Sequence, residues 1–441
     1  MIDMAERKRI SEVLKMADKE KTVISGFIRN IRNKGKNLKF IIVNDGSGET
    51  QVTCLRNIMN ERIDDLNGIS INSVLIFSGT VQKTELSNLG TEILCEDFDV
   101  LSVSEAGLPI DSSDKIESSL EKRLNWRFLD LRNEKKKIIF KIYSDFLKYS
   151  RTFFDSNNLT EIISSKIMGS ASEGGSEVFT IDYFDRKAYL SQSPQFYKQM
   201  AISSGFEGVF EIGPAFRAEP SFTSRHTTEF TSLDIEIAYI SSEEDIMKFE
   251  EKWLQYALKN IKEKYGEIIK ELYNIEITVP EIPFPRINMK KAHEIAAEAG
   301  IILNENQDLN SDGEKALGEY VKKEFGNDFV FLTDFPAAVR PFYHMRPEDK
   351  SKTKSFDLIY KGVEITTGAQ REHRYDILMK QIEEKGINPE TLNEYTNYFR
   401  FGCPPHGGFG MSPARLVTML LNLENIREAT MVPRDVKRLE P

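Results

Sequence analysis

The stretch FEIGPAFRAEPSFTSRHTTEFTSLDIEIAYI, from Phe210 to Ile240, predicts a long β-hairpin. Apolar and polar residues alternate along both arms, and a polar loop separates the arms. Because successive side chains of a strand point to opposite faces, one face of the hairpin enters a core and the other stays available for a ligand. Arg217, Asp234 and Glu236 are expected to share the second face.

The loop of this hairpin adds Arg225 and His226 to Arg217. A guanidinium group pairs bidentately with phosphate oxygens, so two arginines and a histidine in so short a span suit a triphosphate. The alternative is an exposed, solvated hairpin. The segment alone favours the phosphate interpretation only slightly.

A second segment, Ser355–His373, is expected to bring two carboxylates together. A tight turn that ends at Gly362 would make Asp357 and Glu364 direct cross-strand neighbours. Facing like charges destabilise a strand pair. A divalent cation removes that penalty, and Mg²⁺ favours one or two carboxylates together with substrate phosphates. A register shifted by one residue, with one carboxylate in solvent, is the alternative; Arg371 is expected near the same site.

A third segment, Gly402–Arg415, contains three closely spaced glycines, Gly407, Gly408 and Gly410. Glycines allow a backbone to approach a ligand closely. The run Met411–Leu421 is expected to be helical, with Arg415 in its first turn, and a helix N-terminus with an arginine suits a phosphate. A flexible glycine loop is an equally weighted alternative.

The whole chain of 441 residues exceeds the usual size of one domain, which predicts two. Between Thr22 and about Val103, five short strand-like runs predict a small barrel of the OB type, a common nucleic-acid platform. We expect this domain over 1–105, a hinge over 106–135, and an α+β domain over 136–441. In the last, helical periodicity at 136–155 and 243–273 alternates with strands, which indicates an antiparallel sheet flanked by helices.

Composition narrows the class of protein. Residues 1–40 hold eleven Lys or Arg and five Asp or Glu, so this segment carries +6 although the whole chain carries −10. That asymmetry permits a basic N-terminal domain that contacts phosphates, with a solvated charged face as the alternative. The three cysteines lack disulfide or zinc spacing, and no run of 18 apolar residues or signal-peptide core occurs. A cytoplasmic protein without membrane contact is expected.

The sequence also indicates which chemistry to expect. Neither a Ser-His-Asp set, nor a Cys-His pair, nor a zinc site stands out among five histidines and three cysteines. In-line attack of a carboxylate on a phosphate needs positioning, metal ions and cationic clamps more than acid–base groups. The residues collected above suit that chemistry.

Together these segments resemble the signature motifs of class II aminoacyl-tRNA synthetases. Phe216–Glu219 with Arg225-His226 and Glu229-Phe230 resembles motif 2, Gly408–Gly410 with Arg415-Leu416 resembles motif 3, and Val432–Asp435 resembles the family's C-terminal ending. Three further runs resemble the aspartyl subgroup of archaeal and eukaryotic type: Glu173–Ser176, Gln192–Gln195 with Lys198-Gln199, and Gly368–Arg371. The resemblance covers nearly the whole chain, in order.

The resemblance implies activation of L-aspartate with ATP and transfer to tRNA(Asp), with tRNA(Asn) left open as a second substrate. The implied ATP-binding residues are Arg217, Glu219, Arg225, His226, Phe230, Glu364, Gly410 and Arg415, with Arg217 and Arg415 catalytic. The implied aspartate-binding residues are Glu173, Ser193, Gln195, Lys198, Asp234, Thr367 and Arg371, with Lys198 and Arg371 on the side-chain carboxylate. Asp357 and Glu364 would bind Mg²⁺.

In the N-terminal barrel the resemblance implies an anticodon site. Phe40 would stack on a base, while Gln51 and Glu92 would read base edges. Stacking plus edge hydrogen bonds is how proteins usually read single-stranded RNA. A place in the barrel core is the alternative for Phe40.

Two positions depart from the family pattern, and both are serines. Ser165 stands where motif 1 normally has a proline, and Ser412 stands where motif 3 normally has a second glycine. A homodimer is still expected, because the helix from Ile139 to Phe153 offers an apolar face. The competing readings are an asparaginyl-tRNA synthetase, which gains nothing from two cations around a neutral amide, and a non-catalytic tRNA-binding paralogue.

Overall fold

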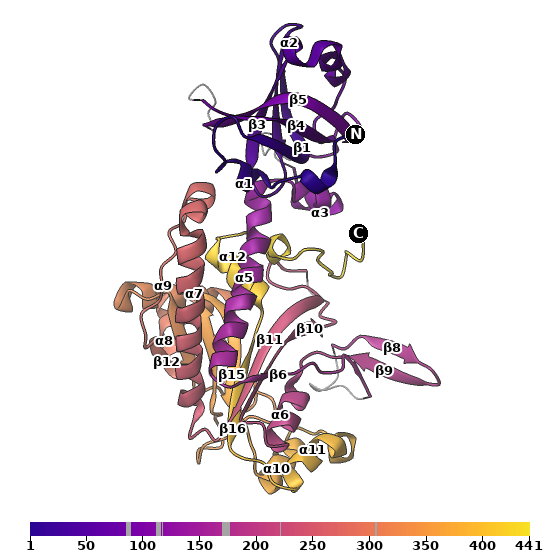
Figure 1. The fold of residues 1–441 in the computed structure, drawn as a ribbon. Helices are drawn as coiled ribbons and strands as arrows, with labels where there is room; N and C mark the ends of the chain where they lie inside the picture. The colour runs from indigo at the N-terminus through magenta and orange to yellow at the C-terminus, as the bar shows by residue number, and fades with distance from the viewer. Residues whose placement is uncertain (85–89, 112–115, 117, 170–176, 221, 305–306) are drawn as a thin grey trace. The chain divides into compact units, whose positions relative to one another are not determined.

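The computed structural model of the chain describes residues 1–84, 90–111, 116, 118–169, 177–220, 222–304 and 307–441 (Figure 1). It contains two compact units, Met1–Pro109 and Ile110–Pro441. Most of the segment expected as a hinge, 106–135, therefore groups with the second unit.

The first unit is a closed barrel with the strand order β1-β2-β3-β5-β4, which confirms the predicted OB-type fold. Its strands are β1 (Lys21–Asn33), β2 (Leu38–Asn44), β3 (Glu49–Leu55), β4 (Val74–Lys83) and β5 (Thr91–Ser102). Alternate residues of every strand fill the interior, among them Ile24, Ile41, Val52, Phe77 and Ile93. Short helices complete the unit: η1 (Met4–Glu6), α1 (Ile10–Val13), α2 (Arg56–Met59) and η2 (Asn60–Leu66).

The second unit is built on an eight-stranded sheet with the order β12-β13-β14-β15-β16-β11-β10-β6. Its strands are β6 (Thr160–Glu161), β10 (Gly208–Phe216), β11 (Glu229–Ala238), β12 (Arg286–Asn288), β13 (Phe329–Thr333), β14 (Ser355–Tyr360), β15 (Val363–Gln370) and β16 (His406–Met411). The strands from β13 to β10 run antiparallel, as predicted. The two edge strands pair in parallel, which the sequence did not indicate.

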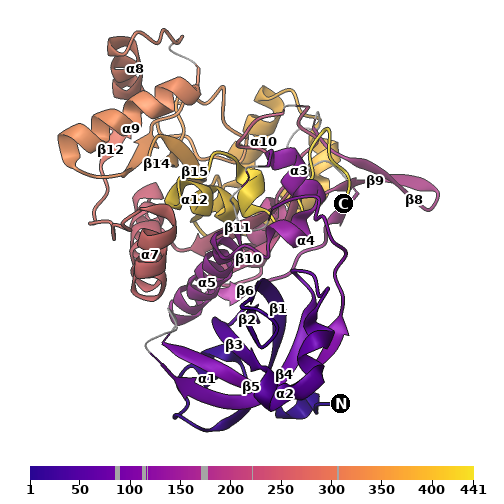
Figure 2. The same ribbon diagram turned by 90° about the horizontal axis from the view of Figure 1, so that it is seen from above.

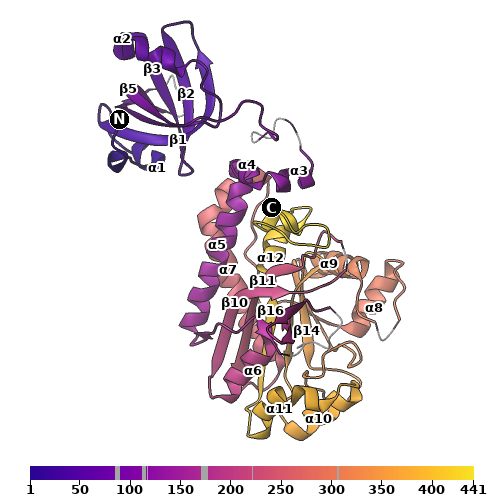
Figure 3. The ribbon, with the colours of Figure 1, turned by 90° about the vertical axis from the view of Figure 1, so that its right-hand side faces the viewer.

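One face of this sheet is covered by α5 (Glu134–Ser156), α7 (Glu243–Tyr273) and α12 (Pro413–Leu420), as Figure 3 shows. A capping box of Ser242 and Asp245 starts α7, and Asn274 in the left-handed conformation ends it. Trp253 of α7 lies fully buried between Phe146 of α5 and Phe409 of the sheet. Because α5 already packs on α7 with its apolar stripe, that stripe is not the free dimer face that the sequence suggested.

The remaining helices pack around the ends of the sheet (Figure 2). Helices α8 (Met289–Glu298) and α9 (Ser311–Phe325) cover β12 to β14, while α6 (Gln195–Ser203), α10 (Tyr375–Glu384), η3 (Pro389–Leu392) and α11 (Asn393–Arg400) form another cluster. Helices α3 (Leu120–Asn125) and α4 (Arg127–Asp130) precede α5, and η4 (Ile426–Ala429) follows α12. A small separate sheet consists of β7 (Ile167–Met168), β8 (Thr180–Tyr183) and β9 (Arg186–Leu190). In the described ranges no helix is long and apolar enough to span a bilayer.

Candidate active site

A pocket of about 400 Å³ lies on the face of the sheet opposite α5 and α7. All three segments singled out in the sequence contribute to its wall. The lining includes Arg217, Glu219, Arg225, His226, Phe230, Asp234, Glu364, Thr367, Arg371, Gly410 and Arg415. The structure therefore brings together most of the residues assigned to ATP and to aspartate.

The hairpin β10–β11 forms as predicted, with Glu211 opposite Asp234 and Phe216 opposite Glu229. Along β11, Leu233 and Ile235 enter the core, and the alternate residues Ser232 and Asp234 line the pocket. Arg217 follows directly on β10, and its guanidinium lies 5.4 Å from the ring centre of Phe230. With its side chain 48% exposed, Arg217 remains accessible to a phosphate.

The loop between these strands carries two more cationic candidates. The hydroxyl of Thr223 lies 2.7 Å from Nδ1 of His226. Burial lowers the pKa of His226, and the charge of Arg415 lowers it further. Arg225 donates from Nη1 to Oε2 of Glu314 in α9 at 2.9 Å.

The C-terminal segment holds this loop in place. Arg427 of η4 donates from Nη1 to the carbonyl of Thr223 at 2.7 Å and from Nε to Asp435 at 2.6 Å. Its guanidinium lies 4.4 Å from the ring centre of Phe222. The backbone N–H of Thr228 donates to the carbonyl of Arg434 at 2.8 Å. The segment Val432–Asp435, which resembles the family's C-terminal ending, therefore supports this loop from outside the pocket.

The turn between β14 and β15 differs from the prediction. Lys361 and Gly362 form the two-residue loop, both with positive φ (51° and 73°), which is the type I′ geometry of tight hairpins. Asp357 consequently pairs with Thr367, so the predicted direct pairing of Asp357 with Glu364 is wrong, as is the alternative of a one-residue shift.

A β-bulge nevertheless turns Glu364 toward the pocket. Leu358 pairs with Thr366 and Ile359 with Glu364, so Ile365 is an extra residue on β15. In a regular strand, residues three apart point to opposite faces. Here the hydroxyl of Thr367 donates to Oε1 of Glu364 at 3.1 Å, because the bulge puts both on the pocket side.

Asp357 is buried and does not line the pocket. Its Oδ2 accepts a hydrogen bond from Arg340, whereas its Oδ1 is buried and has no hydrogen-bond partner in the described part of the chain. Burial raises the pKa of Asp357 to about 7 against the opposing charge of Arg340, and the charge of Glu364 adds to the rise. No group of three or more His, Cys, Asp or Glu residues suited to a metal occurs among the residues that the structure describes.

The glycines of the third segment form a strand rather than a loop. β16 runs between β11 and β15, so close that a Cβ at Gly408 would lie 2.0 Å from the carbonyl oxygen of Ile235. A Cβ at Gly410 would lie 2.9 Å from Oδ1 of Asp234. The segment is therefore a strand and not a flexible loop. Gly410 lines the pocket, and the glycines also let neighbouring strands lie close together.

Helix α12 begins at Pro413, within the run Met411–Leu421 that is predicted to be helical, with Ser412 as its N-cap. Arg415 lies in its first turn and donates from Nη1 to the carbonyl of Glu364 at 2.8 Å. Within the described ranges the Nε of Arg415 and the hydroxyl of Ser412 are buried without hydrogen-bond partners, and both residues line the pocket.

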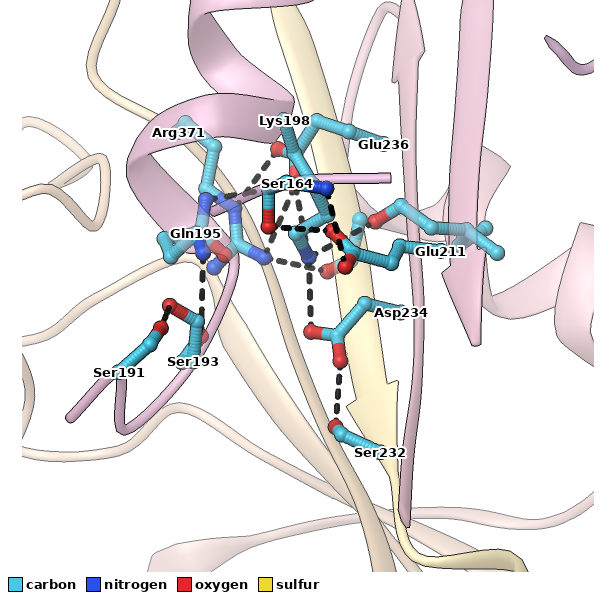
Figure 4. Close-up of polar contacts among 12 residues, drawn as sticks. Ser164, Ser191, Ser193, Gln195, Lys198, Glu211, Ser232, Asp234, Glu236 and Arg371 are labelled. Carbon is cyan, nitrogen blue, oxygen red and sulfur yellow. Dashed lines mark hydrogen bonds and ion pairs between the residues drawn. The ribbon is translucent and has the colours of Figure 1, made fainter. Parts of the chain in front are cut away.

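The site also contains a buried ionic cluster, which consists of Lys198, Asp234, Glu236 and Arg371 (Figure 4). Lys198 of α6 has three acceptors around Nζ: Asp234 Oδ1 at 3.1 Å, Glu236 Oε2 at 3.3 Å and the carbonyl of Ile235 at 3.1 Å. Arg371 donates from Nε to Oε1 of Glu236 at 2.9 Å. Burial alone would raise the pKa of Glu236, but Arg371 and Lys198 outweigh burial and lower it. The carboxylate is therefore ionised at neutral pH.

Of the other residues assigned to aspartate, some line the pocket, and one lies outside the residues that the structure describes. Ser193, Gln195 and Thr367 line the pocket, and Gln195 donates to Glu236 at 3.3 Å. Lys198 is absent from the lining because its acceptors enclose it. Glu173 lies outside the described residues.

Sequence reasoning missed Arg340 and His344, which also line the pocket. They belong to the run Arg340-Pro341-Phe342-Tyr343-His344, where a cation and an imidazole flank two aromatic residues. This cluster of a cation, two aromatic residues and an imidazole was the feature of the sequence that could have identified Arg340 and His344. The run has no regular strand or helix periodicity, and tertiary contacts hold it at the site: the bridge between His344 and Arg371 and the hydrogen bond from Arg340 to Asp357.

In the barrel, the three anticodon candidates share one outer region. Phe40 is half-buried on β2 and pairs with Thr53, so it does not belong to the barrel core. Gln51 pairs with Glu92 and donates to it at 2.8 Å, and Thr53 donates to the same carboxylate at 2.7 Å. An aromatic ring and hydrogen-bonding side chains therefore lie on neighbouring positions of β2, β3 and β5.

Comparison with known proteins agrees with both units. Residues 22–101 match the OB-fold nucleic acid binding domain, and residues 119–436 match the tRNA synthetases class II (D, K and N). The chain is 41% identical to the aspartate–tRNA(Asp) ligase of Pyrococcus abyssi and 40% identical to the aspartate–tRNA(Asp/Asn) ligase of Methanopyrus kandleri, over 98% of both chains in each case.

Solved structures give the same assignment. The asparaginyl-tRNA synthetase of Pyrococcus horikoshii complexed with asparaginyl-adenylate superimposes with a TM-score of 0.91 at 32% identity, over 99% of this chain and 100% of that one. A putative aspartyl-tRNA synthetase of Leishmania major gives 0.90 at 30% identity, over 99% and 94%. The chain has an OB-type barrel and a cation-lined pocket on an antiparallel sheet, and it matches these proteins over nearly its whole length. It therefore belongs to the class II aminoacyl-tRNA synthetases of the D, K and N group.

Proposed function

We propose that this synthetase is an aspartate–tRNA ligase, which activates L-aspartate with ATP and transfers it to tRNA(Asp). The observation that carries the proposal is the pair of buried cations Lys198 and Arg371 beside the cation-lined pocket. The curated relatives named above support it, because their names specify aspartate. The solved asparaginyl enzyme shares the fold, so the fold alone does not choose the amino acid.

Charge favours aspartate over asparagine. Lys198 and Arg371 carry two positive charges, and Glu236 carries one negative charge among them. Asp234, which pairs with Lys198 at 3.1 Å, would also bind the substrate's ammonium group, so the ammonium charge balances that of Asp234. One positive charge then remains for the side-chain carboxylate of aspartate, whereas the neutral amide of asparagine would leave a buried charge uncompensated.

In the first step the α-carboxylate of aspartate attacks the α-phosphorus of ATP. The new carboxyl-oxygen-to-phosphorus bond forms as the bond to diphosphate breaks, which gives aspartyl-adenylate. Arg217 is proposed to bind the α-phosphate, while Arg225, His226 and Arg415 bind the outer phosphates and Phe230 stacks on the adenine. The charges of the three arginines compensate the charge that develops in transfer, so no general base is needed.

Asp357 and Glu364 are the proposed Mg²⁺ ligands. The buried, unpartnered Oδ1 of Asp357 and the pocket-facing carboxylate of Glu364 fit an ion that takes one or two carboxylates together with phosphate oxygens. Bound there, Mg²⁺ would withdraw charge from the phosphates of ATP. Glu219 is proposed to contact the adenine or the end of the tRNA.

In the second step the terminal ribose hydroxyl of the tRNA attacks the carbonyl of the adenylate, and AMP leaves. The barrel would hold the anticodon through Phe40, Gln51 and Glu92. A homodimer is also proposed, now from the exposed apolar side chains beside edge strand β6: Ile163 is 94% exposed and Ile167 is 48% exposed. Sedimentation at micromolar concentration tests this, and a monomer would contradict it.

The proposed function is tested by amino-acid-dependent exchange of diphosphate into ATP, without tRNA. Aspartate should support exchange far better than asparagine or lysine. Charging of purified tRNA(Asp) and tRNA(Asn) with aspartate then decides whether one or both are substrates. Exchange that depends on asparagine instead would reject the proposal, and absence of exchange with any amino acid would favour a non-catalytic paralogue.

A further inference from the structure

The guanidinium of Arg371 has almost no freedom to choose its partners. It carries five N–H donors. Nε donates to Oε1 of Glu236 at 2.9 Å, and Nη2 donates to Oε2 of Glu236 at 3.4 Å and to the carbonyl of Gly408 at 3.0 Å. Nη1 lies 3.1 Å from Nε2 of His344. Among the residues that the structure describes, these contacts commit four of the five donors and leave the second N–H of Nη1 for a substrate.

The contact with His344 also fixes the state of the imidazole. A guanidinium offers only donors, so Nε2 of His344 must accept and the ring proton must reside on Nδ1. Burial lowers the pKa of His344 well below its ordinary value, and the charges of Arg371 and Arg340 lower it further. The ring is therefore neutral, and it binds Arg371 without cancelling its positive charge.

The backbone holds this imidazole against Arg371. His344 and Arg371 form an antiparallel bridge, flanked by hydrogen bonds from Met345 to Gln370 and from Glu372 to Tyr343 at 3.0 and 2.9 Å. Gln381 of α10 donates to the carbonyl of His344 at 3.2 Å. His344 is 2% exposed and lines the pocket, and its Nδ1 is buried with no hydrogen-bond partner among the described residues.

We propose that His344 is a specificity-determining residue for the amino acid: a neutral acceptor that aims the last free N–H of Arg371 at the substrate's side-chain carboxylate. This rests on the proposed aspartate specificity. A carboxylate at this position would cancel the single positive charge that the cluster leaves for the substrate. An apolar residue would remove the acceptor of one Nη1 N–H, and a buried donor without an acceptor costs free energy.

Glutamine and asparagine separate this role from a packing role, because both are neutral amides of smaller volume than histidine. The Oε1 of glutamine reaches the place of Nε2, whereas the shorter asparagine reaches only that of Nδ1. In His344→Gln the Michaelis constant for aspartate should stay within about threefold of wild type. In His344→Asn and His344→Leu it should rise about tenfold, the usual loss for one hydrogen bond to a charged group, while that for ATP stays unchanged.

The measurement is diphosphate exchange with aspartate varied at saturating ATP and the reverse, after thermal unfolding has shown each variant folded. His293→Gln, on α8 outside the pocket, is the matched control and should behave as wild type. The inference is overturned if His344→Leu leaves the aspartate constant unchanged, if Gln and Asn are equally impaired, or if the aspartate and ATP constants rise together. Exchange by the wild type with asparagine and not aspartate would instead overturn the proposed function.

Discussion

Nη1 of Arg225 lies 2.9 Å from Oε2 of Glu314, which ties the loop between β10 and β11 to helix α9. The same Nη1 lies 3.2 Å from the hydroxyl of Ser311 at the start of that helix. Arg225 lines the pocket, and its contacts with the described residues leave Nε and Nη2 available to a phosphate. Glu314 is 15% exposed at its side chain, and the pair is therefore sheltered from solvent.

Removal of this anchor should weaken ATP binding selectively. Glu314→Ala should raise the Michaelis constant for ATP roughly tenfold, because a hydrogen bond to a charged group contributes about 1.5 kcal/mol. Glu314→Gln keeps an acceptor and should change it by less than about threefold. Diphosphate exchange measures both, and Glu319→Ala on the exposed face of α9 is the control. A lower ATP constant in Glu314→Ala would mean that Glu314 competes with ATP for Arg225.

A barrel variant separates tRNA recognition from activation. Phe40→Ala should weaken charging of tRNA(Asp) by about tenfold or more, since a base–aromatic stack contributes about 1–3 kcal/mol. Exchange without tRNA should remain at the wild-type rate, because Phe40 belongs to the first unit and the pocket to the second. Phe401→Ala, which removes an exposed ring from the second unit, is the control. Equal loss in both assays would show that Phe40 has a structural role.

A third prediction concerns stability and pH. Glu250 of α7 is fully buried, accepts from the hydroxyl of Thr366 at 2.6 Å, and has an Oε2 without a hydrogen-bond partner. Burial raises the pKa of Glu250 from 4.5 to about 8. The folded protein therefore holds this proton more tightly than the unfolded chain. Between about pH 4.5 and pH 8 its free energy of unfolding should fall as pH rises.

Glu250→Gln should remove that slope, because the amide does not ionise. The melting temperature of the variant should exceed that of wild type by more at pH 9 than at pH 5. At pH 9 the difference in the free energy of unfolding should be on the order of a few kcal/mol. Glu267→Gln, on the exposed face of the same helix, should show no such trend. Parallel pH profiles for Glu250→Gln and wild type would exclude a raised pKa.

The alternation of apolar and polar residues predicted the β10–β11 hairpin correctly. Side chains alternate between the two faces of a strand, so the burial of one face can be recognised from a short stretch of chain. Leu233 and Ile235 had to enter the core, and Asp234 had to lie on the other face. The register of β14 and β15 could not be predicted in the same way. It depends on a positive φ at Lys361, for which lysine carries no signal, and on an extra residue at Ile365.

Tertiary contacts explain the other misses. Glycine has a low strand propensity, so the sequence of β16 predicts a loop. The neighbouring strands, however, leave no room for a Cβ at Gly408, and glycine is therefore needed in this strand. Arg340 and His344 lie in an irregular segment whose position follows from pairing with Arg371, 27 residues away from His344. Local sequence contains no trace of that pairing.

The enclosure of Lys198 leads to the last prediction. Its ammonium group is fully buried and already has three acceptors, among them Asp234 and Glu236. Aspartate must therefore share this cation with existing carboxylates. Removal of one partner of a buried charge pair costs about 2–5 kcal/mol. Lys198→Leu should raise the Michaelis constant for aspartate at least about thirtyfold and leave that for ATP almost unchanged.

Diphosphate exchange before tRNA is added measures this effect, because the free amino acid is selected in that half-reaction. Lys39→Leu is the matched control: Lys39 is 3% exposed in the barrel, where it donates to Asn33 and Asn67. The control should lose stability without a change in either exchange constant. Asparagine should lose far less than aspartate in Lys198→Leu, since it brings no charge to the cluster. If ATP and aspartate weaken alike, Lys198 only supports the fold, and Arg371 alone must account for the choice of an acidic substrate.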